Sequence, residues 1–338
     1  MKVAVLLSGG VDSSVAALLL KDQGYDVMGL TMVNWDSRVG EKAAQAARRL
    51  NIEHRIVDLK ELFHTRIIDY FCRSYETGNT PNPCVECNKY IKFGALLDIA
   101  LEAGCDLVAT GHYARIEFNG ELNRYLLKKG IDSSKDQSYF LYGLKQEQLS
   151  HIIFPLGNLK KSEVRDIARQ KSVPAAEAPD SQEICFITGD YGDFIKDRVK
   201  FKHGEVVDTN MKLVGTHRGL PFYTIGQRRG LGISSSRPLY VIGMDLGKNR
   251  LLVGGQEQLY TKTLYASQNN FIYINQLDSP LQVEAKIRYR ANAAPAVISM
   301  ETNGMVKVDF EEPQRAITRG QSVVFYRDEY VVGGGIIE

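Results

Sequence analysis

A short apolar run, Val3–Leu7, is followed at once by the turn Ser8-Gly9-Gly10-Val11-Asp12-Ser13. The apolar run predicts a buried strand, and the residues from Ser13 to Gln23 predict a helix that Gly24 ends. Small residues in such a turn let backbone N–H groups converge on an anion, and the helix N-terminus adds a partial positive charge. The turn therefore predicts a phosphate-binding loop between the first strand and the first helix.

The loop has the pattern SGGxDS. It lacks the lysine of GxxxxGK[ST] and does not match GxGxxG. It resembles the PP-loop of ATP pyrophosphatases, which cleave ATP to AMP and pyrophosphate and use the AMP to activate an oxygen atom. The structural alternative is a glycine-rich helix cap without a ligand, but the strand-turn-helix context favours the PP-loop.

Residues 2–110 alternate between strand and helix patterns, which predicts a parallel sheet covered by helices. Further strands are expected at Val27–Val33, His54–Leu59 and Asp106–Thr110, and further helices at Glu41–Leu50, Lys60–Tyr75, Tyr90–Ala103 and Lys160–Lys171. Ligands bind beyond the carboxyl ends of parallel strands. This rule places the PP-loop, Met32 and Thr110-Gly111-His112 at one edge.

Asn79–Lys89 contains two prolines and the pair Cys84 and Cys87. The prolines predict an extended, stiff loop that presents both thiols. A helix expected to begin near Asn88 would place Cys87 at a helix N-terminus, where the dipole lowers a thiol pKa. Two incidental thiols are the alternative interpretation, and Cys72 and Cys105 look like core residues.

The second half of the chain has a different sequence pattern, in which short strands predominate. A hairpin is predicted around Asn119-Gly120, and short strands with glycine-rich turns follow from about residue 200, with a basic turn at Arg228-Arg229. Strands at regular spacing after Gln258 predict a β-barrel, in which Arg288-Tyr289-Arg290 would lie on a strand. The predicted class is α/β. A parallel-sheet PP-loop domain (1–199) would precede a small β-rich domain (200–258) and a C-terminal β-barrel (259–338).

Composition narrows the class of protein. The 338 residues are 44% hydrophobic and 24% charged, with a net charge of +2, values typical of a globular domain. No apolar run approaches the roughly 20 residues of a membrane span, and five cysteines are an odd number for a disulfide framework. We expect a cytoplasmic protein without a membrane partner, whose nucleic-acid site, if present, is a local patch.

Seven segments occur in the order of the tRNA-specific 2-thiouridylases, the MnmA family, which the chain resembles over essentially its whole length. They are the PP-loop, Asn79–Phe93, Ala109–Arg115, Lys135–Leu141, Asp180–Ile187, Tyr223–Gly232 and Ile287–Arg290. The resemblance implies a PP-loop domain, a central domain and a barrel. It also implies an enzyme, a tRNA-uridine 2-sulfurtransferase, that uses ATP and Mg²⁺ to thiolate the wobble uridine of tRNA.

The resemblance carries roles onto matching positions. ATP would be bound by Leu6, Leu7, Ser8, Gly9, Gly10, Val11, Asp12, Ser13, Met32 and Gly111. The tRNA would be contacted by Asn82, Pro83, Cys84, His112, Lys135, Asp136, Gln137, Arg288, Tyr289 and Gln321. In the family's usual scheme Cys185 carries a persulfide and Cys87 releases its sulfur by forming a disulfide.

Cys84 departs from the family, in which many members carry Asp at this position. The exchange replaces a hard oxygen ligand by a soft thiolate beside a second thiolate. Cys84, Cys87 and Cys185 could then hold a 4Fe-4S cluster whose open iron delivers hydrosulfide. We favour this route over the persulfide route, which remains the alternative. Zinc fits less well, because structural zinc normally takes four ligands.

Other functions remain open at this point. A PP-loop ligase of a small metabolite would not need thiols, and a tRNA-binding protein without activity would not need an ATP loop. The sulfur donor is open as well. A cysteine desulfurase, a sulfur-relay protein or inorganic sulfide would each suit the chemistry.

Overall fold

The computed structural model describes residues 1–34, 38–173, 184–187 and 189–338. Its first domain is built on five parallel strands in the order β3-β2-β1-β4-β7. These are β1 (Lys2–Leu6), β2 (Asp26–Val33), β3 (Glu53–Asp58), β4 (Leu107–Ala109) and β7 (Ile152–Ile153). The predicted parallel sheet is confirmed, and β7 is a strand that the sequence pattern did not reveal.

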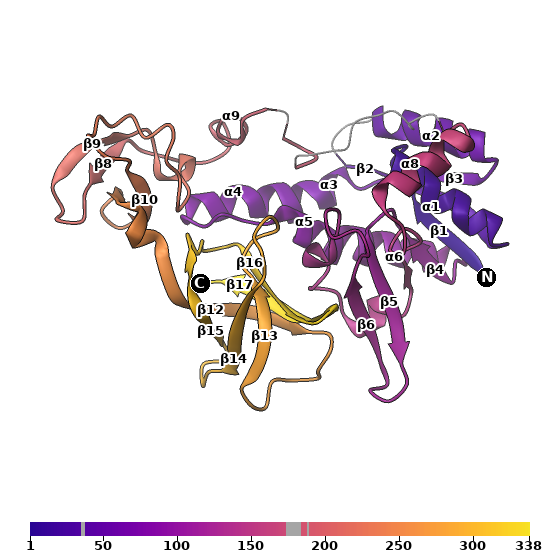
Figure 1. Cartoon of the computed structure of the whole chain (residues 1–338). Coiled ribbons are helices and arrows are strands. Elements are labelled where there is room, and N and C mark those ends of the chain that lie inside the picture. Colours follow the sequence, from indigo (N-terminus) through magenta and orange to yellow (C-terminus); the bar gives the residue numbers. More distant parts are fainter. Residues whose placement is uncertain (35–37, 174–183, 188) are drawn as a thin grey trace.

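Helices cover this sheet (Figure 1). They include α1 (Val11–Asp22), α2 (Arg38–Leu50) and α8 (Lys161–Gln170), and α1 contacts both of the others. One long helix comprises α3 (Lys60–Phe63), the π-helical η1 (His64–Ile68) and α4 (Asp69–Glu76). It leads from the sheet toward the central domain (Figure 1). Other short helices are η3 (Ser138–Phe140), α7 (Gln146–Leu149), α9 (Tyr191–Ile195), η4 (Leu220–Phe222) and η5 (Gln256–Leu259).

The segment with Cys84 and Cys87 is helical, which corrects the prediction of an extended loop. The helix begins at Pro83, five residues before Asn88, and runs through α5 (Pro83–Glu86), the π-helical η2 (Cys87–Ala95) and α6 (Leu96–Glu102). Pro83 occupies the first helical turn, where a missing N–H costs nothing and the fixed φ suits a helix. The second proline therefore starts the helix instead of preventing it.

The central domain is a four-stranded sheet in the order β10-β11-β8-β9. Its strands are β8 (Gly204–Val207), β9 (Leu213–His217), β10 (Tyr240–Asp245) and β11 (Arg250–Gly254). Phe71 and Tyr75 of α4 share one buried apolar cluster with Val241 and Leu251 of this sheet. The long helix thus anchors the central domain to the first.

The C-terminal strands form a barrel, as predicted. They are β12 (Tyr260–Phe271), β13 (Leu281–Lys286), β14 (Ala294–Met300), β15 (Val306–Arg315), β16 (Ser322–Arg327) and β17 (Tyr330–Ile337). Pairing of β12 with both β15 and β17 closes the barrel. The hairpin β5 (Ala114–Asn119) and β6 (Arg124–Lys129) of the first domain joins it through Lys128 and Tyr330.

The barrel and the first domain share a core. Val324 and Tyr326 of β16 belong to the same buried cluster as Phe93 and Leu141. Tyr139 also donates a hydrogen bond to the carbonyl of Ser322 at 2.8 Å. Apolar burial and a satisfied buried hydroxyl both favour a fixed placement of the barrel against the first domain.

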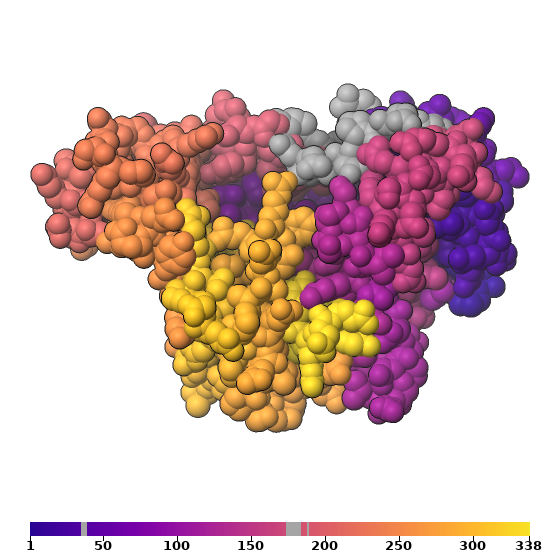
Figure 2. Space-filling model, in the orientation of Figure 1, coloured from indigo at the N-terminus to yellow at the C-terminus, as the bar shows by residue number. Residues whose placement is uncertain are grey.

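The space-filling view is hollowed between the central domain, the barrel and the first domain (Figure 2). Across the described ranges, no helix is both long and apolar enough to cross a membrane.

Candidate active site

The PP-loop residues hold one another through short polar contacts. The backbone N–H groups of Ser8 and Gly10 donate to the hydroxyls of Ser13 (3.2 Å) and Ser8 (3.3 Å), and the two serine oxygens lie 3.1 Å apart. Gly10 is the N-cap of α1, and no side chain caps the helix. The first N–H groups of the helix therefore remain available to an anion.

At two positions of the site a neighbouring backbone lies so close that only glycine fits. A Cβ at Gly9, whose φ is +76°, would lie 2.6 Å from the carbonyl carbon of Lys42 in α2. One at Gly111 would lie 2.8 Å from the backbone of Asp12. Any larger residue would push α1 or α2 away from the loop.

A lysine that the sequence analysis did not identify meets the PP-loop. The Lys161 ammonium, at the start of α8, lies 2.7 Å from both carboxylate oxygens of Asp12, and the Tyr113 hydroxyl donates to the same carboxylate at 2.7 Å. Lys161 is buried. The PP-loop itself lacks the lysine of a GxxxxGK[ST] loop. Lys161 places a lysine ammonium beside it from a helix about 150 residues further along the chain.

These groups line one cavity of about 590 Å³. Its wall contains the PP-loop, Gly111, Tyr113, the segment 133–137, Lys161 and, from the barrel, Lys286, Tyr289, Arg290, Ala291 and Asn292. Four cationic side chains (Lys135, Lys161, Lys286 and Arg290) face two carboxylates (Asp12 and Asp136). Its excess of positive charge suits a polyphosphate. Of the other expected ATP residues, Leu7 is buried and Leu6 and Met32 are partly buried at the ends of β1 and β2.

Lys135, Asp136 and Gln137 were predicted to contact tRNA, and they form part of this wall. Asp136 is buried and accepts hydrogen bonds from the N–H groups of Gly130 (3.0 Å) and Ser138 (3.1 Å). The Gln137 side-chain oxygen accepts one from the Tyr113 N–H at 3.0 Å. These contacts hold the segment against the residues that follow β4.

Three thiols form a second group of reactive side chains. Cys84 and Cys185 are exposed, Cys87 is buried, and all five cysteines of the chain are free thiols. The three sulfurs are close enough to interact electrostatically. Burial raises the pKa of Cys87 to about 12, although Lys92 lowers it in part. Loss of water also raises the pKa of Cys84 and of Cys185, and Lys92 opposes both shifts.

The expected lowering of the Cys87 pKa is therefore wrong. Cys87 is the fifth residue of its helix, where the effect of the dipole is weaker, and desolvation outweighs it. Cys72 and Cys105 are buried, as predicted.

Lys92 also approaches His112. Its ammonium lies 3.5 Å from Nε2 of the imidazole, whose Nδ1 lies 2.7 Å from the Thr110 hydroxyl. Burial, together with Lys92, holds the pKa of His112 well below its usual range, so the ring is neutral. His112 was predicted to contact tRNA, but here it is 7% exposed and faces Lys92 and Thr110.

The three thiols do not form a ready-made metal site. Within the ranges that the structure describes, no three His, Cys, Asp or Glu side chains are grouped so that they could hold a metal ion. Residues 180–183, which precede Cys185 in the chain, lie outside the described residues.

Several other expected tRNA residues have protein partners. The Gln321 amide donates to the carbonyls of Thr80 (2.9 Å) and Pro81 (3.2 Å), and so fixes the loop before Asn82 and Pro83. Arg288 donates to the carbonyls of Arg315 and Ala316. Tyr289 lies against Phe140 with ring centroids 4.4 Å apart.

Arg288–Arg290 do not lie on a strand, which corrects another prediction. Pairing of β13 with β14 ends at Ala285 and Ala294, and β13 itself ends at Lys286. The chain must turn between these positions. The turn projects toward the PP-loop cavity instead of displaying the three side chains along a sheet.

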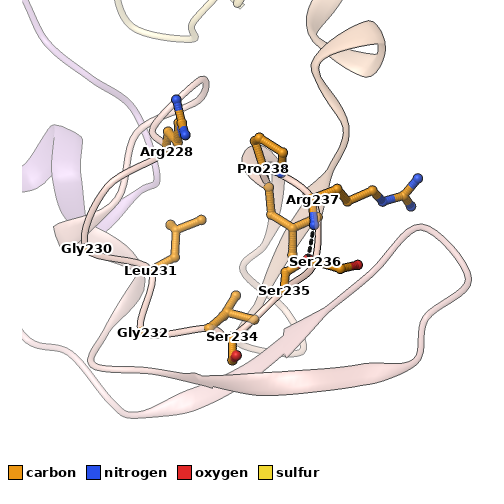
Figure 3. Close-up of a pocket in the computed structure, with 11 residues that line it drawn as sticks. Arg228, Gly230, Leu231, Gly232, Ser234, Ser235, Ser236, Arg237 and Pro238 are labelled. Atoms are coloured by element: carbon orange, nitrogen blue, oxygen red, sulfur yellow. Dashed lines mark hydrogen bonds between the residues drawn. The ribbon is translucent and has the colours of Figure 1, made fainter.

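A second cavity, of about 610 Å³, lies in the central domain (Figure 3). It is lined by Arg228 and by residues 230–239, among them three consecutive serines, Ser234–Ser236, and Arg237. The predicted basic turn thus borders an open, polar hollow that is separate from the PP-loop.

Family models match the chain in three consecutive parts. Residues 1–189 match a tRNA methyl transferase HUP domain, residues 192–255 a tRNA methyl transferase PRC-barrel domain and residues 261–337 an aminomethyltransferase beta-barrel domain. The tRNA-specific 2-thiouridylase MnmA of Syntrophomonas wolfei is 54% identical, with all of both chains covered. The chain belongs to the MnmA family. The MnmA of Moorella thermoacetica is 48% identical over 99% of this chain and 98% of its own.

Membership agrees with the observed architecture of a parallel-sheet domain, a small central domain and a closed barrel. It does not by itself point to Lys161. A signal for this lysine was present, because β7 is a fifth parallel strand and α8 follows it. Had the apolar run Ile152-Ile153 been recognised as a strand, the start of α8 would have been placed at the ligand-binding edge.

Proposed function

We propose that this MnmA-family chain thiolates carbon 2 of the wobble uridine of tRNA, with ATP as the activating substrate. The observation that carries the proposal is the joint presence of a PP-loop cavity with an excess of cations and three neighbouring thiols. The competing functions each need only one of these parts. A metabolite ligase has no use for the thiols, and a tRNA-binding protein has none for the ATP site.

In the activation step, the carbonyl oxygen at carbon 2 attacks the α-phosphate of ATP and pyrophosphate leaves. The PP-loop N–H groups, the α1 N-terminus and Lys161 would bind the departing pyrophosphate. Asp12 would offer a hard carboxylate oxygen to a Mg²⁺ ion, which would supply further positive charge against the phosphates. The oxygen then leaves as part of AMP, which is a far better leaving group than oxide.

In the second step, sulfur attacks carbon 2 and AMP departs. In the persulfide route, the outer sulfur of a Cys185 persulfide becomes bonded to carbon 2. The Cys87 thiolate then attacks the Cys185 sulfur, so that a Cys87–Cys185 disulfide forms and the thiocarbonyl is released. In the alternative route, Cys84, Cys87 and Cys185 would ligate a 4Fe-4S cluster. The structure favours the persulfide route, because the described side chains form no preassembled metal site.

The target base must leave the anticodon stack, which costs a few kcal/mol. Contacts elsewhere must offset this cost. The exposed Arg229 and Arg237 of the central domain, beside the second cavity, are suitable phosphate contacts. In the persulfide route the sulfur donor would be a desulfurase or a relay protein, which carries sulfur at the oxidation level of a persulfide. Inorganic sulfide would serve only the cluster route, in which sulfur is transferred as hydrosulfide without oxidation.

Two measurements test the function. The protein, tRNA, Mg-ATP and a sulfide or persulfide donor should yield 2-thiouridine by mass spectrometry of the nucleosides. Release of pyrophosphate should increase when tRNA is added. Absence of 2-thiouridine with every donor, together with ATP cleavage that ignores tRNA, would reject the proposal.

Cys84→Ser decides between the sulfur routes. Protein reconstituted anaerobically with iron and sulfide is compared with untreated protein, each as wild type and as Cys84→Ser. Full activity of the untreated protein and of the variant supports the persulfide route. Activity that depends on bound iron and is lost in Cys84→Ser supports the cluster.

A further inference from the structure

The cavity that contains the PP-loop is not made by the first domain alone. Five of its lining residues come from the barrel, namely Lys286 at the end of β13 and residues 289–292 of the turn between β13 and β14. Two of them, Lys286 and Arg290, are cationic. Nucleotide recognition by the PP-loop does not explain why a C-terminal barrel should place positive charge there.

The turn is held firmly against the cavity wall. The Tyr289 ring packs on Phe140 at 4.4 Å, and the Lys286 ammonium lies 5.5 Å from the Tyr289 ring and 6.0 Å from the Tyr139 ring. Phe140 and Tyr139 directly follow the segment that contributes Lys135 to the same wall. The two cations therefore belong to a surface that side-chain packing holds in place.

Neither cation is neutralised by the protein. In the part of the chain that the structure describes, Lys286 and Arg290 form no ion pair and donate no hydrogen bond. Lys286 is half-buried, and burial lowers its pKa although Asp136 opposes the shift. Its two aromatic neighbours do not neutralise it, and a desolvated ammonium without an ion-pair partner is costly unless an anionic ligand pairs with it. A phosphate in the cavity would provide that pairing.

We propose that Lys286 and Arg290 bind the pyrophosphate portion of the ATP held by the PP-loop, so that the barrel completes the ATP site. The proposal rests on the proposed function, since it presupposes ATP in this cavity. Two phosphate sources share the required chemistry, namely ATP and the tRNA backbone. The cavity position opposite Asp12 and Lys161 favours ATP.

The test uses the full-length chain without tRNA. Binding of Mg-ATP, of Mg-pyrophosphate and of AMP is measured by calorimetry for the wild type, Lys286→Met, Arg290→Gln and the control Lys307→Gln. Lys307 is a barrel cation paired with Asp309 at 2.8 Å, and it does not line the cavity. Thermal unfolding identifies any variant that fails to fold. Arg290 is exposed, so its variant keeps the test available if Lys286→Met is unstable.

We expect each cavity variant to weaken ATP and pyrophosphate binding about tenfold, with AMP binding and the control unchanged. Affinity for tRNA without ATP should change less than about twofold. Unchanged ATP binding with weakened tRNA binding would overturn the proposal in favour of an RNA phosphate, and no change in either would overturn it as well. If the wild type bound no ATP at all, the proposed function itself would fail.

Discussion

The PP-loop cavity and the thiol site differ in the charge that they present. The cavity is lined by hydroxyls, free N–H groups and four cationic side chains. The thiol site holds three sulfurs whose pKa values are raised by desolvation, with Lys92 opposing the shift of all three. The cavity therefore offers positive charge and hydrogen-bond donors to an anion. The thiol site instead favours protonated sulfur, which is less nucleophilic and less easily oxidised than a thiolate.

This contrast implies that activation and sulfur transfer are separable. In the proposed function, adenylation needs the cavity alone, whereas thiolation needs both sites. Variants of each site should therefore affect different products. The predictions that follow use this separation, and they begin with the largest expected effect.

Cys185→Ser should lower 2-thiouridine formation by about 10³-fold or more, because a hydroxyl cannot carry sulfur. Pyrophosphate release in the first turnover, in the presence of tRNA, should stay within about threefold of wild type, because pyrophosphate leaves before sulfur attacks. Both products are measured in the same reaction, by nucleoside mass spectrometry and by pyrophosphate release. Cys105→Ala, which removes a buried thiol outside the site, is the control. A parallel loss of pyrophosphate release would show that the sites are not separable.

Lys161→Met should reduce AMP formation by about 10- to 100-fold, since it removes a charge-assisted contact to pyrophosphate. Lys171→Met is a matched control, because Lys171 pairs with Asp22 at 3.1 Å and also joins α8 to α1, but at an exposed position. Inhibition by added pyrophosphate is measured for both variants. If pyrophosphate inhibits Lys161→Met more weakly and Lys171→Met normally, Lys161 contacts the ligand. If both variants are affected equally, Lys161 only links α8 to α1.

The sequence predicted the local structure of the PP-loop better than that of the thiol site. The PP-loop is local, and its function depends on backbone N–H groups that Ser8 to Ser13 place in one turn. Lys161 was missed because a two-residue strand, β7, is too short to show a periodic pattern. Arg288 and Arg290 were wrongly placed on a strand, because local alternation does not show where pairing between β13 and β14 stops.

The error at Cys87 has a different origin. Two rules competed at Pro83. The preference of proline for the first helical turn prevailed over its tendency to end helices, and the helix start moved to Pro83. Burial, which decides the thiol pKa, depends on side chains from distant segments and cannot be read from a CxxC spacing.

His112 provides the smallest and most local test, because it lies between the two sites. It follows Gly111 of the cavity wall, and its Nε2 faces Lys92 of the thiol site. Its pKa is held well below the ordinary value of 6.5 by burial and by Lys92. The folded state thus binds fewer protons than the unfolded state, so His112 destabilises the fold as the pH falls below 6.5.

We therefore expect the free energy of unfolding to fall by up to about 1.4 kcal/mol per pH unit below 6.5 through this group. In His112→Gln that part of the slope should be absent, whatever the absolute stability of the variant. Urea unfolding at pH 7.5, 6.5 and 5.5 measures the slope, and His203→Gln, at an exposed position, should leave it unchanged. An identical slope in wild type and His112→Gln would mean that the imidazole is protonated in the folded protein. It would then add a second positive charge beside Lys92, and the proposed contrast between a charged cavity and a neutral thiol site would fail.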